Sequence, residues 1–560
     1  MTARSDGASR RWLLHASCAA VLALVFWVQA SAIRRASSAT FDETIYLGLA
    51  ADVVRNGSFD ELIGQGVAPL PVLVAYTGPA SSAPGDVRDV ATFAARIDEA
   101  RMRAAFWIGI PLVLVVYGWI TRRRGLFGGF LAGALVATSP TVVAHASLAT
   151  TDACFALACL VALAALAAYE EHRSRARWLL VGIALGLALA SKYTATFLFP
   201  VAALVLLRRV AATTGAGQGW SGAIAAEVVP SLAGWSCLAL LVAWACHGFA
   251  VSPLFSTVHA PDDYRRVFGS SAFADALLEI GRAFPVPGPL KGMLRQSVHM
   301  LHGQPAFLDG AISMRGFRSY FPLALAWKST PVELVLGAIA LVGIALRRGD
   351  IAFRIWWQSI AVLLVLAIQS PLDTGVRYVL VLYPLVVLCA VDSLGAWLGA
   401  REERRRALAI AGALLIAAQA ATAARIAPHS LAYFNPLAGG SERGHPRLLD
   451  SNLDWGQDLP ALREVATERG VRELRLSYFG TAPVAAYGVE AIAWSAPGEP
   501  APGSWLAVSA NHLHGLYLDG DPFAWLRAIP PDARAGSSLS LWDLARPDVR
   551  SGFERARARP

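Results

Sequence analysis

The sequence predicts a mainly α-helical protein, a polytopic bundle of membrane-spanning helices followed by a small C-terminal α/β domain. Of its 560 residues 55% are hydrophobic and 16% charged, whereas soluble proteins carry about 25% charged residues. Apolar segments of roughly 20 residues, the length that crosses a bilayer, recur through the first three quarters of the chain. From about residue 425 these segments stop, and short apolar runs alternate with turn residues instead.

We expect about eleven spans, assigned from the length and apolarity of each segment. They centre on residues 12–33, 104–120, 125–142, 153–168, 178–191, 194–207, 229–247, 331–346, 355–370, 377–397 and 407–424. The stretch 178–207 can also be read as one broken hairpin. A cleavable signal peptide is the alternative for the first span. Its apolar run is longer than the usual core of about 7–15 residues, so we expect a retained anchor.

Arginines gather in loops that alternating spans place on one side of the membrane. These loops include Arg10–Arg11, Arg122–Arg124, Arg173–Arg177 and Arg208–Arg209. The positive-inside rule makes that side cytoplasmic, and the N-terminus with it. We therefore expect a bundle over residues 1–424 with two long outer loops, 34–103 and 248–330.

The third outer segment, 425–560, is expected to be the small α/β domain. Strands are predicted at "RELRLSY" (472–478) and "SWLAVSA" (504–510), and a helix at 458–470. A mixture of short strands and a helix after a run of spans favours a separate extracytoplasmic domain.

Two adjacent carboxylates, Asp42 and Glu43, follow the first span in "FDETIYL" (41–47). One explanation is helix capping, in which Thr40 or Asp42 caps a helix and Glu43 interacts with the positive end of its dipole. Capping needs only one small polar group. A carboxylate at the membrane surface, partly shielded from water, can also act as a general base towards a hydroxyl.

Four further residues are candidate substrate ligands at the same outer face. Asp152 opens an apolar helix, where it can be an N-cap or a functional acid. Lys192 lies between two short apolar halves, and Arg377 lies at the outer end of a span. Lysine snorkelling and a surface Asp–Arg pair are the alternatives, but two cations on one face suit a lipid phosphate. Gln304 precedes a span in a polar and aromatic stretch (300–331) that an interfacial helix would also explain.

Other chemistries have little support in the sequence. The six cysteines all lie in or beside apolar segments, so we expect neither a disulfide framework nor a cysteine metal site. "DGD" (519–521) resembles a metal-binding Asp-x-Asp, but a turn before Pro522 explains it better. "HLH" (512–514) has too few ligands for a metal site. We expect no metal ligands, leave a divalent cation open as a cofactor, and expect no nucleic-acid partner.

The order of several motifs resembles that of bacterial glycosyltransferase family 39-like membrane proteins, which are similar to protein mannosyltransferases and the aminoarabinose lipid A transferase. The motifs are "FDETIYL", "HASLATTDACFALACLVALAAL", "GLALASKYTATFLFP", "HGFAVSP", "GQPAFLDG", "YFPLALAWKSTP", "GVRYVLVLYP", "LAYFNPLAGGSERG" and "LLDSNLDWGQDL". The resemblance runs from about residue 38 to the end of the chain.

The resemblance implies a GT-C fold whose active site lies at the outer membrane surface and takes a sugar from a polyprenyl phosphate. The family's catalytic acids map onto Asp42 and Glu43, and its acid after the third span maps onto Asp152. Its phosphate-binding cations map onto Lys192 and Arg377. Two departures are Ser191, where threonine is usual before the lysine, and "APLP" (68–71), where the family often has "HPP".

We therefore expect an integral enzyme of the bacterial inner membrane that moves a sugar from a polyprenyl-phosphate donor to an extracytoplasmic protein, lipid or glycan. Asp42 would act as general base in an inverting displacement, with Glu43 orienting the acceptor or tuning Asp42. A membrane transporter and a non-catalytic envelope assembly protein are the alternatives. A transporter would show charges inside its spans and paired broken helices in two halves. An assembly protein would not require Asp42, Asp152, Lys192 and Arg377 to meet.

Overall fold

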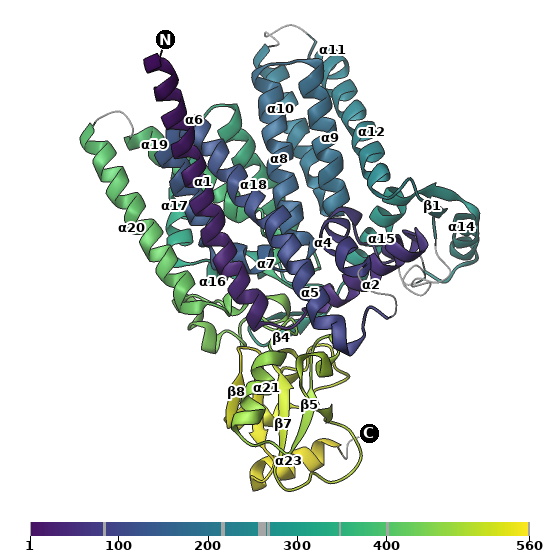
Figure 1. Ribbon diagram of the computed structural model, residues 1–560. Helices are drawn as coiled ribbons and strands as arrows, with labels where there is room; N and C mark the ends of the chain where they lie inside the picture. The colour runs from purple at the N-terminus through teal and green to yellow at the C-terminus, as the bar shows by residue number, and fades with distance from the viewer. Residues whose placement is uncertain are drawn as a thin grey trace.

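Long helices run roughly side by side through most of the molecule, and a small mixed sheet lies against one end of them (Figure 1). The computed structural model describes residues 2–81, 86–213, 219–255, 265, 269–346, 349–398 and 402–557. The N-terminus and α11 (Trp220–Ala223) lie at the end of the bundle opposite the sheet. This arrangement confirms the expected fold class, a polytopic helical bundle with a small C-terminal α/β domain.

Seven helical stretches in the described part of the chain are long and apolar enough to cross a membrane. They are Ser9–Ala36, Val90–Ala137, Thr151–Glu171, Tyr193–Thr213, Trp220–Cys246, Ile351–Ile368 and Glu403–Ile426, with two shorter apolar helices at Pro331–Leu346 and Leu382–Trp397. In the numbering of Figure 1 their main helices are α1 (Thr2–Ala36), α6 (Ile110–Ala137), α8 (Thr151–Glu171), α10 (Leu198–Thr213), α12 (Val229–Cys246), α17 (Pro331–Leu346), α18 (Ile351–Ile368), α19 (Leu382–Leu398) and α20 (Glu402–Ile426). The chain is a multi-pass membrane protein.

One of these stretches, Val90–Ala137, contains two antiparallel spans. It comprises α5 (Val90–Ala104), a π-helical turn η1 (Ala105–Gly109) and α6, and Gly125 has non-helical angles (φ 78°, ψ −178°) inside α6. The chain reverses direction at Gly125. The two halves of α6 then lie side by side, so closely that a Cβ on Gly133 would be 3.2 Å from Cβ of Tyr117. Glycine adopts a positive φ without the steric cost that other residues carry. The two expected spans, 104–120 and 125–142, are these two halves.

Two other breaks in the helices fall beside candidate residues. α6 ends before Ser139, whose hydroxyl accepts from the N–H of Val142 and caps the short helix α7 (Pro140–Ser147). The span expected to reach residue 142 therefore ends earlier, because Pro140 cannot donate to the preceding turn. α9 (Arg175–Ser191) ends at Lys192, whose backbone is extended, and η2 (Tyr193–Phe197) leads into α10. This is the broken hairpin that the sequence allowed.

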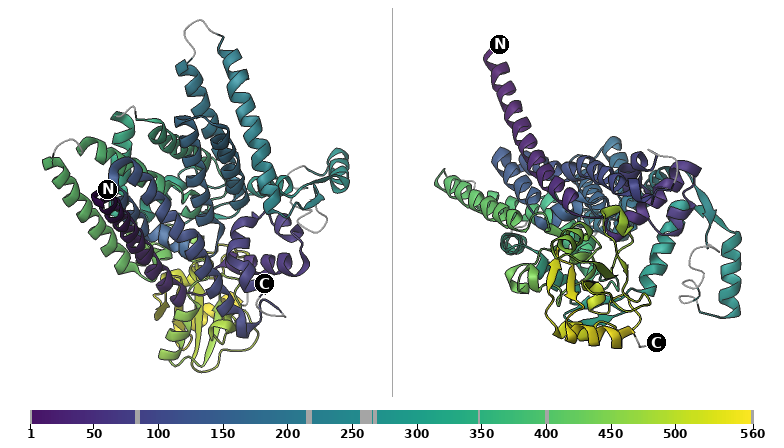
Figure 2. Two further views of the ribbon diagram at one scale, coloured as in Figure 1. Left: turned by 45° about the horizontal axis from the view of Figure 1, so that its top comes forward. Right: turned by 60° about the horizontal axis from the view of Figure 1, so that its bottom comes forward.

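The two outer loops carry short elements at the sheet end of the bundle. The first loop forms α2 (Phe41–Asn56), α3 (Asp60–Gly64), α4 (Pro69–Ser81) and α5; the second forms β1 (Val251–Pro253), α14 (Ala272–Ala283), β2 (Pro285–Pro287), α15 (Gly288–His302), β3 (Ala306–Leu308), β4 (Ala311–Ser313) and α16 (Tyr320–Lys328). The single interfacial helix over 300–331, the alternative explanation for that stretch, does not form, since a β3–β4 hairpin separates α15 from α16. α14 stands away from the other helices (Figure 2).

The C-terminal sheet has five strands in the order β6-β5-β7-β9-β8. They are β5 (Glu473–Ser477), β6 (Ile492–Ala493), β7 (Ser504–Ser509), β8 (Ala533–Ala535) and β9 (Leu539–Asp543). β5 is parallel to β6 and β7, while β9 is antiparallel to β7 and β8. The strands expected at 472–478 and 504–510 are β5 and β7.

Both faces of the central strand β7 are covered, which is why its sequence is apolar throughout. Successive side chains of a strand point to opposite faces. Leu506 and Val508 pack with α23 (Pro547–Arg557), whereas Trp505 and Ala507 belong to the main core that continues into the helical bundle. The sheet is therefore joined to the bundle by a continuous apolar core.

Candidate active site

The first turn of α2 holds Asp42 at the wall of a cavity. Thr40 is the N-cap, and the Glu43 carboxylate accepts from the Thr40 backbone N–H at 2.8 Å, which is the reciprocal bond of a capping box. Asp42 is one residue earlier in that turn, and its side chain remains 19% exposed. The Tyr46 hydroxyl, one turn along the same face, donates to Asp42 at 3.3 Å.

Asp42 belongs to a chain of charged side chains contributed by four distant segments. Arg377 Nη1 lies 2.7 Å from Asp42 Oδ2 and 3.6 Å from Asp152 Oδ2. Asp152 also accepts from Lys192 Nζ through its other oxygen at 2.5 Å. Four of the six candidate residues from the sequence therefore alternate in sign, in the order Asp42, Arg377, Asp152, Lys192.

Local structure explains how each partner reaches this network. Asp152 lies in the first turn of α8 and is completely buried. Lys192 extends from the break between α9 and η2, with its ammonium 4.4 Å from the centre of the Tyr378 ring. Arg377 lies in the 3₁₀ turn η4 (Val376–Val379) before α19, not in the span expected at 377–397. The 3₁₀ turn separates Arg377 from the regular helix and leaves its side chain beside Asp42.

Glu43 does not face this network, although the sequence suggested that both acids would lie in the site. Its carboxylate is fully buried. It accepts hydrogen bonds from Nε and Nη2 of Arg101 at 2.8 and 2.7 Å, and from the N–H of Ala149 at 2.9 Å. Burial alone would raise the pKa of Glu43, but the charge and hydrogen bonds of Arg101, with the backbone donors, leave that pKa lowered. Glu43 is thus a saturated ionic anchor of the first outer loop.

Two adjoining lobes make up the cavity around Asp42. The first has a volume of about 300 Å³, and its polar walls carry Lys192, Arg377 and Arg295. The second, of about 410 Å³, also borders Asp42 and Arg377. Gln304, at the start of the β3–β4 hairpin segment, lines both lobes. Asp152 lies behind the cavity wall, where it joins the two cations.

The wall of the second lobe is largely supplied by the C-terminal domain. Its residues there are Asp450, Trp455, Tyr478, Phe479, Gly480, His512 and Tyr517. The rings of Phe41, Phe479 and Tyr517 are stacked in sequence, with centroid distances of 5.3 and 5.0 Å. The lobe therefore combines aromatic surface with the carboxylates of Asp42 and Asp450.

Asp450 is a second carboxylate of this cavity, and its backbone has a positive φ of 56°. It accepts a hydrogen bond from the hydroxyl of Tyr517, another non-glycine residue with positive φ (64°). Burial raises the pKa of Asp450 to about 6, partly opposed by the positive charge of Arg377. Non-glycine residues rarely adopt such angles, and they cluster at functional sites when the surrounding fold holds them.

A third cavity, of about 380 Å³, adjoins the first lobe and shares Tyr193, Gln296 and Tyr378 with it. Most of its remaining wall is apolar, with Leu363 and Leu366 from α18. Leu366 is 47% exposed. Apolar space thus leads from the charged lobe to the surface of a membrane-spanning helix.

The sequence assigned no role to several residues of the site. Arg101 lies in an ordinary amphipathic pattern, and Tyr517 lies in no motif. Asp450 and Trp455 belong to the motif "LLDSNLDWGQDL", but they reach the site through the docking of the C-terminal domain. Asp458 precedes the helix α21 (Leu459–Glu468) as its N-cap residue, but its side chain makes no capping hydrogen bond and instead accepts from the N–H groups of Ser537 and Ser538. Within the described residues, no group of three or more His, Cys, Asp or Glu is placed to hold a metal ion.

Comparison with known proteins agrees with the class suggested by the motif order. Residues 93–244 match the family model described as dolichyl-phosphate-mannose-protein mannosyltransferase. This match includes Asp152 and Lys192 and confirms the predicted resemblance. Over these residues the chain is similar to membrane glycosyltransferases of the GT-C type. None of the curated proteins matches the chain in sequence.

Sixteen solved chains are similar in structure. The three compared below have low sequence identity to this chain. The oligosaccharyltransferase of Archaeoglobus fulgidus, in complex with Zn and sulfate, is 14% identical, with a TM-score of 0.45 over 89% of this chain and 70% of that one. ArnT from Cupriavidus metallidurans bound to undecaprenyl phosphate is 15% identical, with a TM-score of 0.31 over 95% and 98% of the two chains. Its apo form is 14% identical, with a TM-score of 0.34 over 97% and 99%.

Proposed function

We propose that this membrane glycosyltransferase moves a sugar from a polyprenyl-phosphate donor to an acceptor at the outer surface of the bacterial inner membrane. The observation that supports it best is the alternating network of Asp42, Arg377, Asp152 and Lys192 beside a cavity. It joins a candidate base to candidate phosphate ligands. Neither a transporter nor an assembly protein requires that arrangement, and these residues gather at one end of the bundle.

The donor phosphate is assigned to the first lobe, and its polyprenyl chain to the apolar cavity that adjoins it. Lys192 and Arg377 line the first lobe, and cations near the leaving oxygen stabilise the negative charge that develops there. The apolar cavity borders α18, so a lipid can enter it without leaving the bilayer. Arg377 is well suited to this task because its guanidinium fork matches phosphate geometry.

The acceptor is assigned to the second lobe, on the side of the C-terminal domain. Asp42 borders both lobes, so its carboxylate is placed to take a proton from an acceptor hydroxyl or amine. The attacking atom forms a bond to the anomeric carbon as the bond to the lipid phosphate breaks. One displacement of this kind inverts the anomeric centre. A well-placed general base contributes about 10²–10⁴-fold in rate.

Before the donor binds, Asp42 is paired with Arg377 at 2.7 Å. The pair holds the carboxylate at the cavity wall. It also means that the donor phosphate and Asp42 share one guanidinium, so phosphate binding weakens the hold of Arg377 on Asp42. Glu43 contributes by fixing the turn that carries Asp42, through Arg101, and we assign it a positioning role.

We also assign the enzyme a direction in the membrane, from the placement of its arginines. Arg122–Arg124 lie just before the reversal at Gly125 in α6, Arg173 lies between α8 and α9, and Arg208–Arg209 lie in the last turns of α10. These parts of the helices are at the end of the bundle away from the sheet. The positive-inside rule makes that end cytoplasmic. The N-terminus is then cytoplasmic, and the sheet and the cavity face the periplasm.

The test is Asp42→Asn in purified, reconstituted enzyme, with release of polyprenyl phosphate from a panel of polyprenyl-phosphate sugars as the readout. The matched control is Asp52→Asn, which makes the same change in the same helix at a residue that does not line either lobe. We expect Asp42→Asn to lose at least about 10²-fold in turnover and the control to keep wild-type turnover. Undiminished turnover in correctly inserted Asp42→Asn would refute the assignment.

A further inference from the structure

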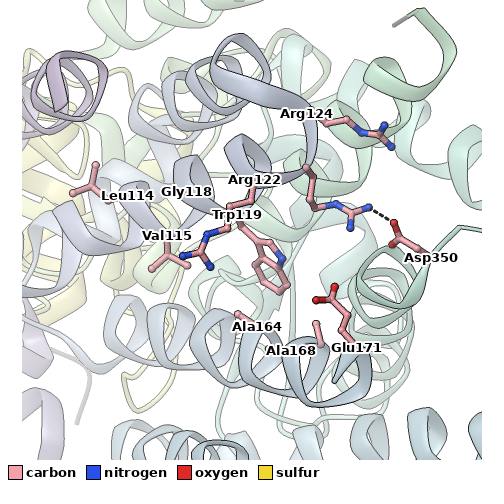
Figure 3. A pocket seen from close by; sticks show the side chains of 12 residues that line it. Leu114, Val115, Gly118, Trp119, Arg122, Arg124, Ala164, Ala168, Glu171 and Asp350 are labelled. Atoms are coloured by element: carbon pink, nitrogen blue, oxygen red, sulfur yellow. Dashed lines mark hydrogen bonds and ion pairs between the residues drawn. The ribbon is translucent and has the colours of Figure 1, made fainter. Parts of the chain in front are cut away.

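The largest of the described cavities lies at the opposite end of the bundle from the candidate active site. It has a volume of about 660 Å³ and lies between α6 and α8. Figure 3 shows Arg122 and Trp119 from one helix facing Ala164, Ala168 and Glu171 of the other. The catalytic assignment leaves this cavity without a role.

Regular spacing along the two helices shows that the cavity is a groove on the lateral surface of the bundle. On one wall, Leu114, Gly118 and Arg122 recur every four residues. Trp107 precedes Leu114 in the same helical stretch, in the π-helical turn η1. On the other wall, Ala164, Ala168 and Glu171 continue a stripe that begins at Val161. Those first residues, Trp107 and Val161, are 59% and 40% exposed. Each wall thus runs from lipid-facing apolar surface to a charged side chain.

The dimensions of the groove match one leaflet of a bilayer. Leu114 and Arg122 are eight residues apart, or about 12 Å along the helix axis. Half of a hydrocarbon core of about 30 Å is about 15 Å. The small residues Gly118, Ala164 and Ala168 leave the space that larger side chains would fill, and Trp119 lies close to the charged end, where tryptophan is favoured at membrane interfaces.

At the polar end of the groove, one cation and one anion have no partner within the described chain and can bind a ligand. Arg123 is paired with Asp350 and Asp392, and Arg124 binds Asp392 through two hydrogen bonds of 2.8 and 3.0 Å. Arg122 and Glu171, by contrast, make no hydrogen bond or ion pair with any part of the chain that the structure describes. Both are exposed and border the same cavity.

We infer that this groove binds a phospholipid with a primary-ammonium headgroup, in the leaflet opposite the candidate active site. Its phosphate binds the guanidinium of Arg122, its ammonium binds the carboxylate of Glu171, and its acyl chains fill the groove between Gly118 and Ala164. An anionic headgroup fits less well, because it would bring no cation to Glu171 and the other two arginines are already neutralised. A trimethylammonium headgroup cannot donate hydrogen bonds to Glu171.

Native mass spectrometry of the full-length protein, titrated with phosphatidylethanolamine, phosphatidylglycerol and phosphatidylcholine of matched chains, tests this inference. Wild type should bind phosphatidylethanolamine about fivefold more tightly than the other two, the effect of roughly one charge contact at the membrane surface. Arg122→Gln should weaken binding of all three lipids. Glu171→Gln should bring phosphatidylethanolamine down to the level of phosphatidylglycerol.

The matched control is Arg175→Gln, which removes an exposed arginine at the start of α9 (Arg175–Ser191), outside the groove. It should keep the wild-type order of lipids. Equal or tighter binding of phosphatidylglycerol by wild type overturns the inference without any variant. So does a Glu171→Gln protein that keeps the wild-type preference, or an Arg122→Gln protein that binds as well as the control.

Discussion

Removing the charge of Glu43 is expected to destabilise the whole protein, because its ion pair with Arg101 is almost free of water. The Arg101 and Glu43 side chains are 1% and 0% exposed. The carboxylate accepts two bonds from Arg101, two from Thr40 and one from Ala149. Arg101 also donates to the carbonyls of Ser37 and Ser38. The pair therefore holds the end of α1, the start of α2 and the segment before Asp152.

Glu43→Gln preserves the shape of the side chain but leaves the Arg101 guanidinium buried without an anion. Breaking a buried pair in this way costs about 3–5 kcal/mol, which lowers the folding equilibrium constant more than about 100-fold. The free energy of unfolding in SDS-titrated mixed micelles measures this loss directly. Glu554→Gln breaks the half-exposed pair with Arg550 in α23, and it should cost less than about 1 kcal/mol.

A double-mutant cycle with Arg101→Gln separates the ion pair from the other effects of each substitution. The two single variants should each be strongly destabilised. The double variant should be less destabilised than their sum, by about 1–3 kcal/mol, because neither charge remains buried alone. Additive losses, or a Glu43→Gln protein as stable as Glu554→Gln, would refute the reading of Glu43 as an ionic anchor.

Three further substitutions test the cavity and its supports. Asp152→Asn removes the group that joins Lys192 to Arg377, and donor turnover should fall about 10²-fold while the protein stays inserted. The pKa of Asp450 is raised from 3.8 to about 6. The free energy of unfolding of the wild-type protein therefore falls as pH rises from about 4 through about 6, where this carboxyl group ionises in the folded state. Asp450→Asn should therefore gain on the order of 2–3 kcal/mol in unfolding free energy at pH 8, and little at pH 4, relative to wild type. Lys328→Met leaves the carbonyls of Leu431 and Asn452 without their donor, and pulse proteolysis should show a loss of at least about 2 kcal/mol.

Bilayer thickness and loop charge make the arrangement of the helices predictable from the sequence. Each expected span overlaps a helix, because a helix satisfies all the backbone hydrogen bonds of about 20 apolar residues within the segment itself. Where the helices break was harder to foresee. Lys192 lies at a break that the short apolar halves suggested, whereas η4 around Arg377 has no such signal.

The disagreement over Glu43 follows from helix geometry. Neighbouring residues of a helix are about 100° apart around its axis, so adjacent side chains do not face the same way. Once Asp42 points into the cavity, Glu43 points towards α5, where Arg101 meets it. The capping alternative for this motif predicted the reciprocal bond with Thr40. It did not predict an arginine from 58 residues further along the chain.

Sequence patterns did not predict that the C-terminal domain contacts the candidate active site. The contacts of Arg377 show why this docking matters for the site. Its guanidinium lies 4.3 Å from the centre of the Trp455 ring, and its Nε donates to the Ser451 hydroxyl at 3.1 Å. Through Nη1 the same side chain reaches Asp42 on the first outer loop. A single arginine thus connects the start of the chain, the end of the bundle and the domain that follows it. Since Asp42 and the domain both hold that arginine, the geometry of the candidate base depends on how the domain docks.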